Sequence, residues 1–311
     1  MHCFRNILYV TLKPGDQSFA LNEALRIAQQ NETSLKVLAI FPEFPGELKP
    51  FQDKFKQSVL DQLEASVKEN CDSPEMDPGK ISYEVEFGKT PGLRMVRQVL
   101  RHDFGLIIKD AEPHEGGKGF QAVDMELLRK CPCPVWLCRP PRANREDSKL
   151  AVAIDPDSSA PAGEGLALKL LEVASSVAER LTQDLNIISC WDSEFEETLR
   201  SNVWFRIPED ALQHTVANIF ARHRNALRSL IQQAALEEKF RLHHLHGQPD
   251  ELIPSFVERN GIDILVMGTV ARVGIPGFLI GNTAENVLQK VSCSLLVVKP
   301  EGFVCPVKME A

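Results

Sequence analysis

Residues 263–300, DILVMGTVARVGIPGFLIGNTAENVLQKVSCSLLVVKP, decide the fold of this chain. They begin with Ile264–Met267, a short and continuously apolar run that is typical of a strand covered on both faces. A loop with four glycines follows. Apolar residues then recur at i, i+3, i+4 and i+7 from Ala284 to Val291, which predicts a helix, and Ser294–Lys299 is a second buried-type strand. Strand, glycine-rich loop, helix and strand in this order indicate a βαβ unit of a parallel sheet.

The glycine-rich loop is suited to anion binding, because free backbone N–H groups and the helix dipole favour a phosphate at the start of the following helix. Its spacing is Gly268, two residues, Ala271, nine residues, then Gly281 followed by Asn282 and Thr283. This pattern resembles the universal stress protein signature, G-x2-G-x9-G-(S/T). The glycine patterns of dinucleotide-binding folds and of P-loops do not occur in the chain.

Two residues depart from that signature. Ala271 stands where the family has its second glycine, and a Cβ there costs roughly 1–2 kcal/mol if the position needs a left-handed backbone. Asn282 replaces Ser or Thr, although its amide can still donate a hydrogen bond. The alternative role of Asn282 is a helix N-cap, with Glu285 three residues on completing a capping box.

An internal repeat sets the domain organisation. Residues 128–140 align with residues 288–300 at one constant offset of 160 positions, and the proline-and-charge segment 140–147 has nothing to bury. A period this long indicates two copies of a domain rather than a solenoid. We therefore predict two domains, residues 1–141 and residues 149–304, the second carrying the modified glycine motif.

The predicted fold class is α/β, with two tandem, doubly wound, five-stranded parallel sheets. The resemblance to universal stress proteins covers nearly the whole chain in their tandem, E-type arrangement. It implies a Rossmann-like fold akin to the adenine nucleotide alpha-hydrolases, with the two copies packed as a pseudo-dimer. Because family members pair through their last strands, we expect 134–139 to lie beside 295–299, which would cover two sheet edges.

Only the second copy keeps the residues of a binding site. In nucleotide-binding family members an Asp ends the first strand, a position held by Asp155 in the second half and by Thr11 in the first. The first half has an acidic loop, 110–119, that fits no phosphate motif and is predicted to be mobile. The first half is thus interpreted as a scaffold copy. The predicted ligand-binding residues are Asp155, Gly268, Ala271, Gly281, Asn282 and Thr283.

Composition excludes several classes of protein. The chain has 311 residues, 43% hydrophobic and 25% charged, as in ordinary globular proteins. Its net charge of −8 argues against a nucleic-acid surface. The apolar run Ile7–Leu12 is too short for a signal segment and no run approaches membrane-spanning length, so we expect a cytoplasmic protein.

Cysteine and histidine patterns point to structure rather than to chemistry. Eight scattered cysteines are expected to be reduced and buried, and Cys131-Pro132-Cys133 is the one place to look for redox chemistry. His243, His244 and His246 lie on a predicted strand, where only His244 and His246 share a face. No third ligand lies at readable spacing from that pair, so we predict no metal site.

The resemblance implies a non-enzymatic, cytoplasmic universal stress protein with a role in stress response and survival. No catalytic residue is assigned, because the G-x-S-x-G and H-E-x-x-H patterns are absent. No cofactor is certain; ATP or AMP bound weakly in the second domain is the candidate. One alternative is an ATP-dependent switch or slow ATPase, and another is a pocket repurposed for a different phosphate-bearing or amphipathic metabolite. Expected partners are a small-molecule ligand and, beyond the intramolecular pseudo-dimer, a second copy of the chain.

Overall fold

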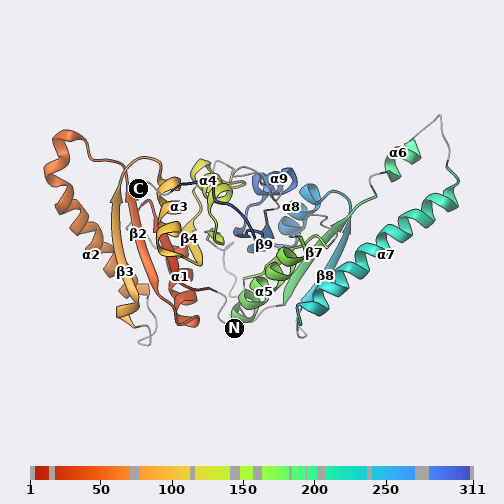
Figure 1. The fold of residues 1–311 in the computed structure, drawn as a ribbon, viewed down its shortest axis with the longest axis horizontal. Helices are drawn as coiled ribbons and strands as arrows, with labels where there is room; N and C mark the ends of the chain where they lie inside the picture. The colour runs from red at the N-terminus through yellow and green to blue at the C-terminus, as the bar shows by residue number, and fades with distance from the viewer. Residues whose placement is uncertain are drawn as a thin grey trace.

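The computed structural model describes residues 4–13, 18–70, 77–112, 116–140, 148–156, 163–181, 184–193, 195–201, 207–236, 240–269 and 280–308. Within these residues the strands form one 10-stranded sheet in the order β3-β2-β1-β4-β5-β10-β9-β6-β7-β8 (Figure 1). Each half of the chain contributes five consecutive strands to this order, and the strands within each half pair in parallel. The predicted α/β fold of two tandem, doubly wound, five-stranded parallel units is confirmed, but the two predicted sheets are continuous with each other, because β5 pairs with β10.

The elements of the first half are β1 (Ile7–Thr11), α1 (Phe19–Gln30), β2 (Leu35–Phe41), η1 (Gly46–Phe51), α2 (Gln52–Asn70), η2 (Pro78–Lys80), β3 (Ile81–Phe87), α3 (Pro91–His102), β4 (Leu106–Asp110), α4 (Ala122–Lys130) and β5 (Val135–Cys138). Those of the second half are β6 (Leu150–Ala153), α5 (Gly163–Leu181), β7 (Leu185–Trp191), α6 (Glu196–Ser201), α7 (Glu209–Gln233), β8 (Phe240–His246), α8 (Pro249–Asn260), β9 (Ile264–Gly268), α9 (Asn282–Lys290) and β10 (Ser294–Val298).

The two halves join through their last strands, which we call the seam. β5 and β10 run antiparallel, with Leu295 opposite Leu137, Leu296 opposite Trp136 and Val297 opposite Val135. The predicted contact between 134–139 and 295–299 is therefore confirmed. All of these strand residues are buried, so each half uses the other to cover an edge that would otherwise expose unpaired backbone groups.

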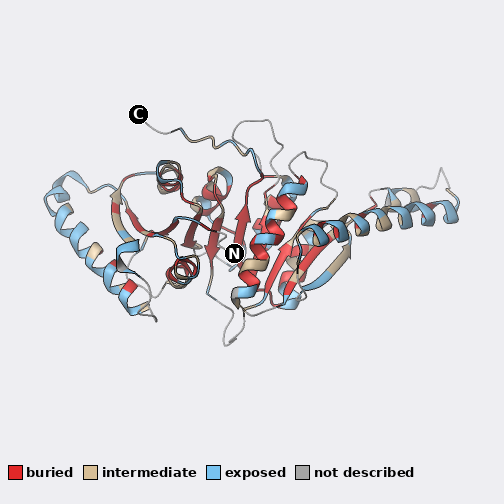
Figure 2. Ribbon diagram, turned by 60° about the horizontal axis from the view of Figure 1, so that its bottom comes forward, coloured by how far each residue is buried: buried red, intermediate tan, exposed pale blue. Residues whose placement is uncertain are grey.

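Helices cover both faces of the sheet, and each face has a core that crosses the seam. The helices α1, α2, α5 and α7 pack on one face, and α3, α4, α8 and α9 pack on the other. Trp136 of β5 and Leu296 of β10 both lie in the first of these cores and are fully buried. In Figure 2 burial concentrates in the central strands, whereas α2 and α7 expose most of their outer surface.

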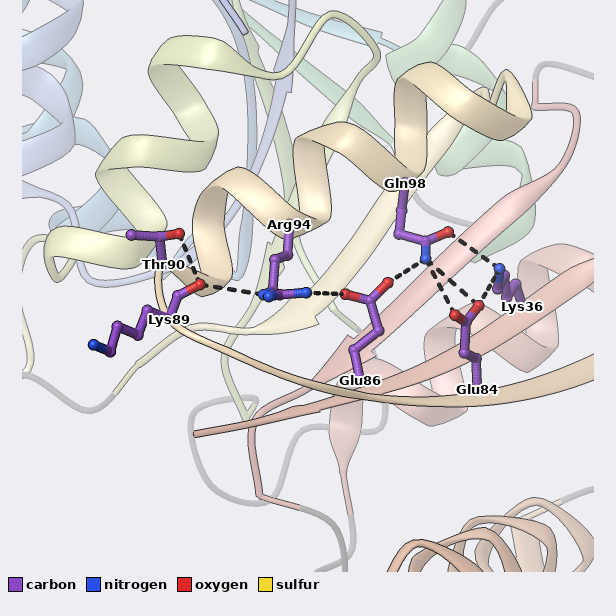
Figure 3. A network of polar contacts seen from close by, with 7 residues as sticks. All are labelled: Lys36, Glu84, Glu86, Lys89, Thr90, Arg94 and Gln98. Atoms are coloured by element: carbon purple, nitrogen blue, oxygen red, sulfur yellow. Dashed lines mark hydrogen bonds and ion pairs between the residues drawn. The ribbon is translucent and has the colours of Figure 1, made fainter. Parts of the chain in front are cut away.

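A polar network covers one face of the outer strand β3 (Figure 3). Lys36 of β2 lies 2.5 Å from Glu84 and donates to Gln98 of α3, whose amide also reaches Glu86. Arg94 of α3 completes the row, with its guanidinium 3.1 Å from Glu86. Charged side chains along an outer strand oppose edge-to-edge association, so this network protects an edge that the other half does not cover.

No helix of the described residues is long and apolar enough to cross a membrane.

The seam predicts one cooperative unfolding unit. Leu296→Ala would leave a cavity in a core shared by both halves and is expected to cost roughly 2–5 kcal/mol of unfolding free energy. Leu242→Ala on the outer strand β8, where the side chain is 37% exposed, is the matched control and should cost much less. Guanidinium unfolding followed by circular dichroism measures both. Equal losses, or two separate transitions in the parent protein, would contradict a shared core.

Candidate functional site

A cavity of about 620 Å³ opens at the carboxyl ends of β6, β7 and β9 in the second half. β6 and β9 are neighbours in the sheet, and the strand order reverses between them, which is the usual ligand position in doubly wound folds. The helices α5, α7, α8 and α9 supply its walls. Its lining includes Asp155, Leu166, Leu170, Cys190, Trp191, Ile219, His223, Ile253, Gly268, Gly281 and Thr283.

One end of the cavity is suited to an anion. Gly268 ends β9, and Gly281 is the N-cap of α9 with an extended backbone (φ −60°, ψ 146°). The first N–H groups of a helix have no partner within the helix, and the helix dipole adds positive potential there. Thr283, exposed in the first turn, adds a hydroxyl to the same end. A phosphate can therefore be held here without a cationic side chain.

A carboxylate marks a second polar position. Asp155 follows β6, is exposed and lines the cavity. Burial, together with the Asp155 carboxylate, raises the pKa of the nearby Cys190 thiol to about 12. The thiol consequently stays protonated at neutral pH, and only the thiolate is an effective nucleophile. Cys190 is thus a packing residue rather than a catalytic one.

The body of the cavity is apolar and its outer rim is aromatic. Leu166 and Leu170 of α5, Ile219 of α7 and Ile253 of α8 form much of the body. At the rim Trp191 stacks on His246, with ring centroids 4.2 Å apart. The rim thus presents a large aromatic surface.

The histidines of β8 each have a different partner. His243 Nε2 lies 3.0 Å from Asn186 Oδ1, and His244 Nε2 lies 2.8 Å from His223 Nδ1 of α7. Burial first, and then His223 and Arg224, lower the pKa of His244. Among the described residues no three metal-ligating side chains gather at one point. The His223–His244 contact instead ties α7, a wall of the cavity, to the sheet.

The structure brings four of the six predicted site residues to this cavity: Asp155, Gly268, Gly281 and Thr283. Asn282 is exposed and does not line the cavity, and Ala271 lies outside the described residues. Sequence reasoning missed Trp191 and the α7 wall. The apolar stripe of α7 was visible in the sequence, but it indicates packing in general and not a cavity.

The capping role predicted for Asn282 is wrong. The helix α9 begins at Asn282, and Gly281 is its N-cap, with no side-chain cap bond. Glu285 does not reach back to the cap; it pairs with Arg129 of α4 across the seam. An oppositely charged partner from the other half has replaced the local capping interaction.

The corresponding position in the first half is closed by its own side chains. Asp110 ends β4 as Gly268 ends β9, and its carboxylate accepts from Ser18 Oγ at 2.5 Å and from Ala20 N at 3.0 Å. A carboxylate thereby occupies the N-terminus of α1. Thr11, which holds the position of Asp155 in the first half, is buried.

The loop that is predicted to be mobile in the first half makes several contacts in the part that the structure describes. Gly117 O accepts from Arg139 at 2.7 Å, and Gly119 N donates to Val291 O at 3.0 Å. Gly119 has φ +76°, and a Cβ there would lie 2.9 Å from Gln289 O. Gly119 thus allows close approach to the other half, which is a packing role and not phosphate binding.

Comparisons with known proteins agree with this fold. The model of the universal stress protein family matches residues 148–299. The matched residues make up the second half of the chain, which is thus similar to universal stress proteins. Over its full length it is similar to Universal stress protein E of Escherichia coli K12, with 27% identity over 100% of this chain and 98% of that protein. Universal stress protein E of Photorhabdus laumondii is also 27% identical, over 98% of both chains.

Solved structures show the same tandem fold. A Pseudomonas aeruginosa PAO1 protein described as functionally unknown is 26% identical, with a TM-score of 0.72 and coverage of 96% of this chain and 94% of that one. A putative universal stress protein of Pseudomonas aeruginosa UCBPP-PA14 has 24% identity, a TM-score of 0.69 and coverage of 96% and 95%.

The raised pKa of Cys190 makes a direct prediction about reactivity. At pH 8 its thiolate fraction should be roughly a few thousandfold below that of an ordinary thiol of pKa about 8.5. Alkylation rates at this residue, measured by mass spectrometry from pH 7 to 10, should rise tenfold per pH unit without reaching a plateau. Asp155→Asn should speed the reaction modestly, since the carboxylate is the smaller of the two causes. A plateau near pH 9 would contradict the assignment.

Proposed function

We propose that this protein is a non-enzymatic universal stress protein of the cytoplasm that binds a phosphate-bearing small molecule in its second half. ATP or AMP, held weakly, is the first candidate ligand, and binding serves a role in stress response and survival. The observation that carries the proposal is the contrast between the halves. The position held by Gly268 at the open cavity is held in the first half by Asp110, whose carboxylate binds to the N-terminus of α1.

The dimensions and chemistry of the cavity support a nucleotide-sized ligand. Its volume of about 620 Å³ falls within the range typical of small-molecule sites. The N-terminus of α9 offers backbone donors for phosphate, whereas Asp155 offers an acceptor for hydroxyl or amino groups on the remainder of the ligand.

A binding role is better supported than a catalytic one. General-base catalysis of hydrolysis needs a base within hydrogen-bond reach of a nucleophile or a water. In the cavity the Cys190 thiol is held protonated, and His223 is hydrogen-bonded to His244. An ATP-dependent switch or slow ATPase would appear as ADP release during the binding measurements described below.

A second candidate follows from the apolar body of the cavity. The side chains of Leu166, Leu170, Ile219 and Ile253 give the cavity an apolar lining, which phosphate groups cannot contact favourably. They favour a ligand that joins a phosphate to an apolar part, so a different amphipathic metabolite is the alternative occupant.

Closing the cavity with the first half's own residue tests the proposal. Gly268→Asp places a carboxylate where a Cβ alone already lies 2.7 Å from Leu166 Cδ2, so ATP binding should fall by at least about tenfold, or 1.4 kcal/mol. Gly165→Asp is the matched control, because it adds the same charge in α5 where nothing lies within 4 Å of the new Cβ. Calorimetry at one salt concentration compares the three proteins. Unchanged affinity in Gly268→Asp would place the ligand elsewhere.

Restoring the family motif should strengthen nucleotide binding. Ala271→Gly combined with Asn282→Ser returns both departures to the signature. If position 271 needs a left-handed backbone, relief of that strain alone would add about 1–2 kcal/mol. Loss of a helix cap is not expected, since Gly281 and not Asn282 caps α9. If the folded double variant binds ATP no better than the parent, the loop is not the obstacle, and the amphipathic ligand becomes the favoured candidate.

A further inference from the structure

Two basic residues occupy equivalent positions directly after the seam strands. Arg139 follows β5 and Lys299 follows β10, at the constant offset of 160 positions that relates the two copies. Lys299 is only 4% exposed and Arg139 is half-buried. A buried charge must be compensated by hydrogen bonds, so the partners of these two cations show what they hold together.

Lys299 joins the cavity strand of the second half to a helix of the first half. Its ammonium donates to Thr269 Oγ1 at 2.8 Å and to Leu128 O, and lies 4.8 Å from the Phe303 ring centroid. Thr269 is fully buried and directly follows Gly268 at the cavity. Leu128 lies in the last turn of α4, where Pro132 has no N–H to donate to its carbonyl. The Lys299 ammonium of the second half therefore supplies the hydrogen bond that the Leu128 carbonyl of the first half lacks within its own helix.

Arg139 makes the reciprocal connection. Its guanidinium donates to Gly117 O and Gly119 O of its own half, and to Val291 O, 3.5 Å away, at the C-terminus of α9. It also lies 4.6 Å over the Phe120 ring, as Lys299 lies over Phe303. Each cation thus binds the loop after the fourth strand of its own half and the carboxyl end of the last helix of the opposite half. Cations at helix C-termini are stabilised by the helix dipole.

Together the two cations anchor both elements that frame the anion end of the cavity. Lys299 holds the residue after β9, and Arg139 holds the far end of α9, whose N-terminus carries Gly281 and Thr283. A phosphate must match the spacing between Gly268 and the α9 N-terminus to within hydrogen-bond distance. Contacts with the first half therefore help to fix this spacing.

We propose that Lys299 is a positioning residue for the ligand site, and that through it the first half regulates the affinity of the second. This inference rests on the proposed function, since it concerns the same cavity. Coupling is reciprocal: a ligand that tightens the anion end stabilises the seam, and a loosened seam weakens the ligand. The first half is then a structural support that the binding site requires, although it binds no ligand of its own.

The electrostatic setting of Lys299 fits such a role. Burial lowers its pKa to about 8, and the nearby Cys131 is the second influence, acting in the opposite direction. Below pH 8 the side chain is an ammonium with three donors, enough for Thr269, Leu128 and the Phe303 face at once.

Lys299→Met in the full-length chain tests the proposal, because it keeps an unbranched side chain only one atom shorter and removes every side-chain donor. ATP affinity at pH 7 is expected to fall roughly tenfold, within the range typical of coupled sites. Lys299→Arg, which copies the first-half residue, should retain most of the affinity. The matched control is Lys118→Met, which breaks a different contact between the halves, the exposed ion pair Lys118–Glu258 at 3.1 Å, away from the cavity. It should leave the affinity unchanged.

A readout without ligand separates this inference from the proposed function. Hydrogen exchange of the Thr269 amide, which donates to Val298 O, should accelerate in Lys299→Met and not in Lys118→Met. If the parent binds no ATP, the proposed function fails while the exchange data still decide the positioning role. Should Lys299→Met not fold, Thr269→Val removes the acceptor and keeps the ammonium, with the same expected loss. Parental affinity and parental exchange in the folded variant, or an equal loss of affinity in Lys118→Met, would overturn the proposal.

Discussion

The antiparallel pairing of β5 with β10 is the interaction on which the rest of the structure depends. A five-stranded parallel sheet has two open edges, and in each half one of them is a strand with buried side chains on both faces. Pairing these edges satisfies their backbone groups and lets each helix layer continue over the seam. Each half therefore buries its seam strand only by packing against the other half.

The two copies differ at the carboxyl ends of their strands and resemble each other at the seam. At the end of the fourth strand one copy has Asp110 and the other Gly268, and that difference decides whether the space is filled or open. The Asp110 carboxylate is stabilised by Ser18 and by the N-terminus of α1. It supplies internally the negative charge that such a helix terminus attracts.

Most of the fold could be predicted from the sequence, because apolar periodicity and a constant repeat offset are local or regular signals. The site residues Asp155, Gly268, Gly281 and Thr283 could be placed at one cavity because the motif spans a strand end and a helix start. The error in the helix cap has a physical cause. Glu285 forms an ion pair with Arg129, 156 positions away, instead of capping its own helix. The 116–119 loop likewise makes contacts to the end of α9. Interactions between the halves are invisible to reasoning that considers each segment with its sequence neighbours.

The aromatic residues at the outer strand ends show the same division between support and site. In the first half Phe41, Phe55 and Phe87 pack together, with centroids 5.0–6.2 Å apart and no polar atom among their side chains. The second half has Trp191 and His246 at the ends of the matching strands β7 and β8, stacked at the rim of the cavity. Apolar rings suffice for packing at this position, as the first half demonstrates. Trp191 packs on Phe220 of α7 as Phe41 packs on Phe55 of α2, so both halves share this aromatic packing, and Trp191 in addition lines the cavity.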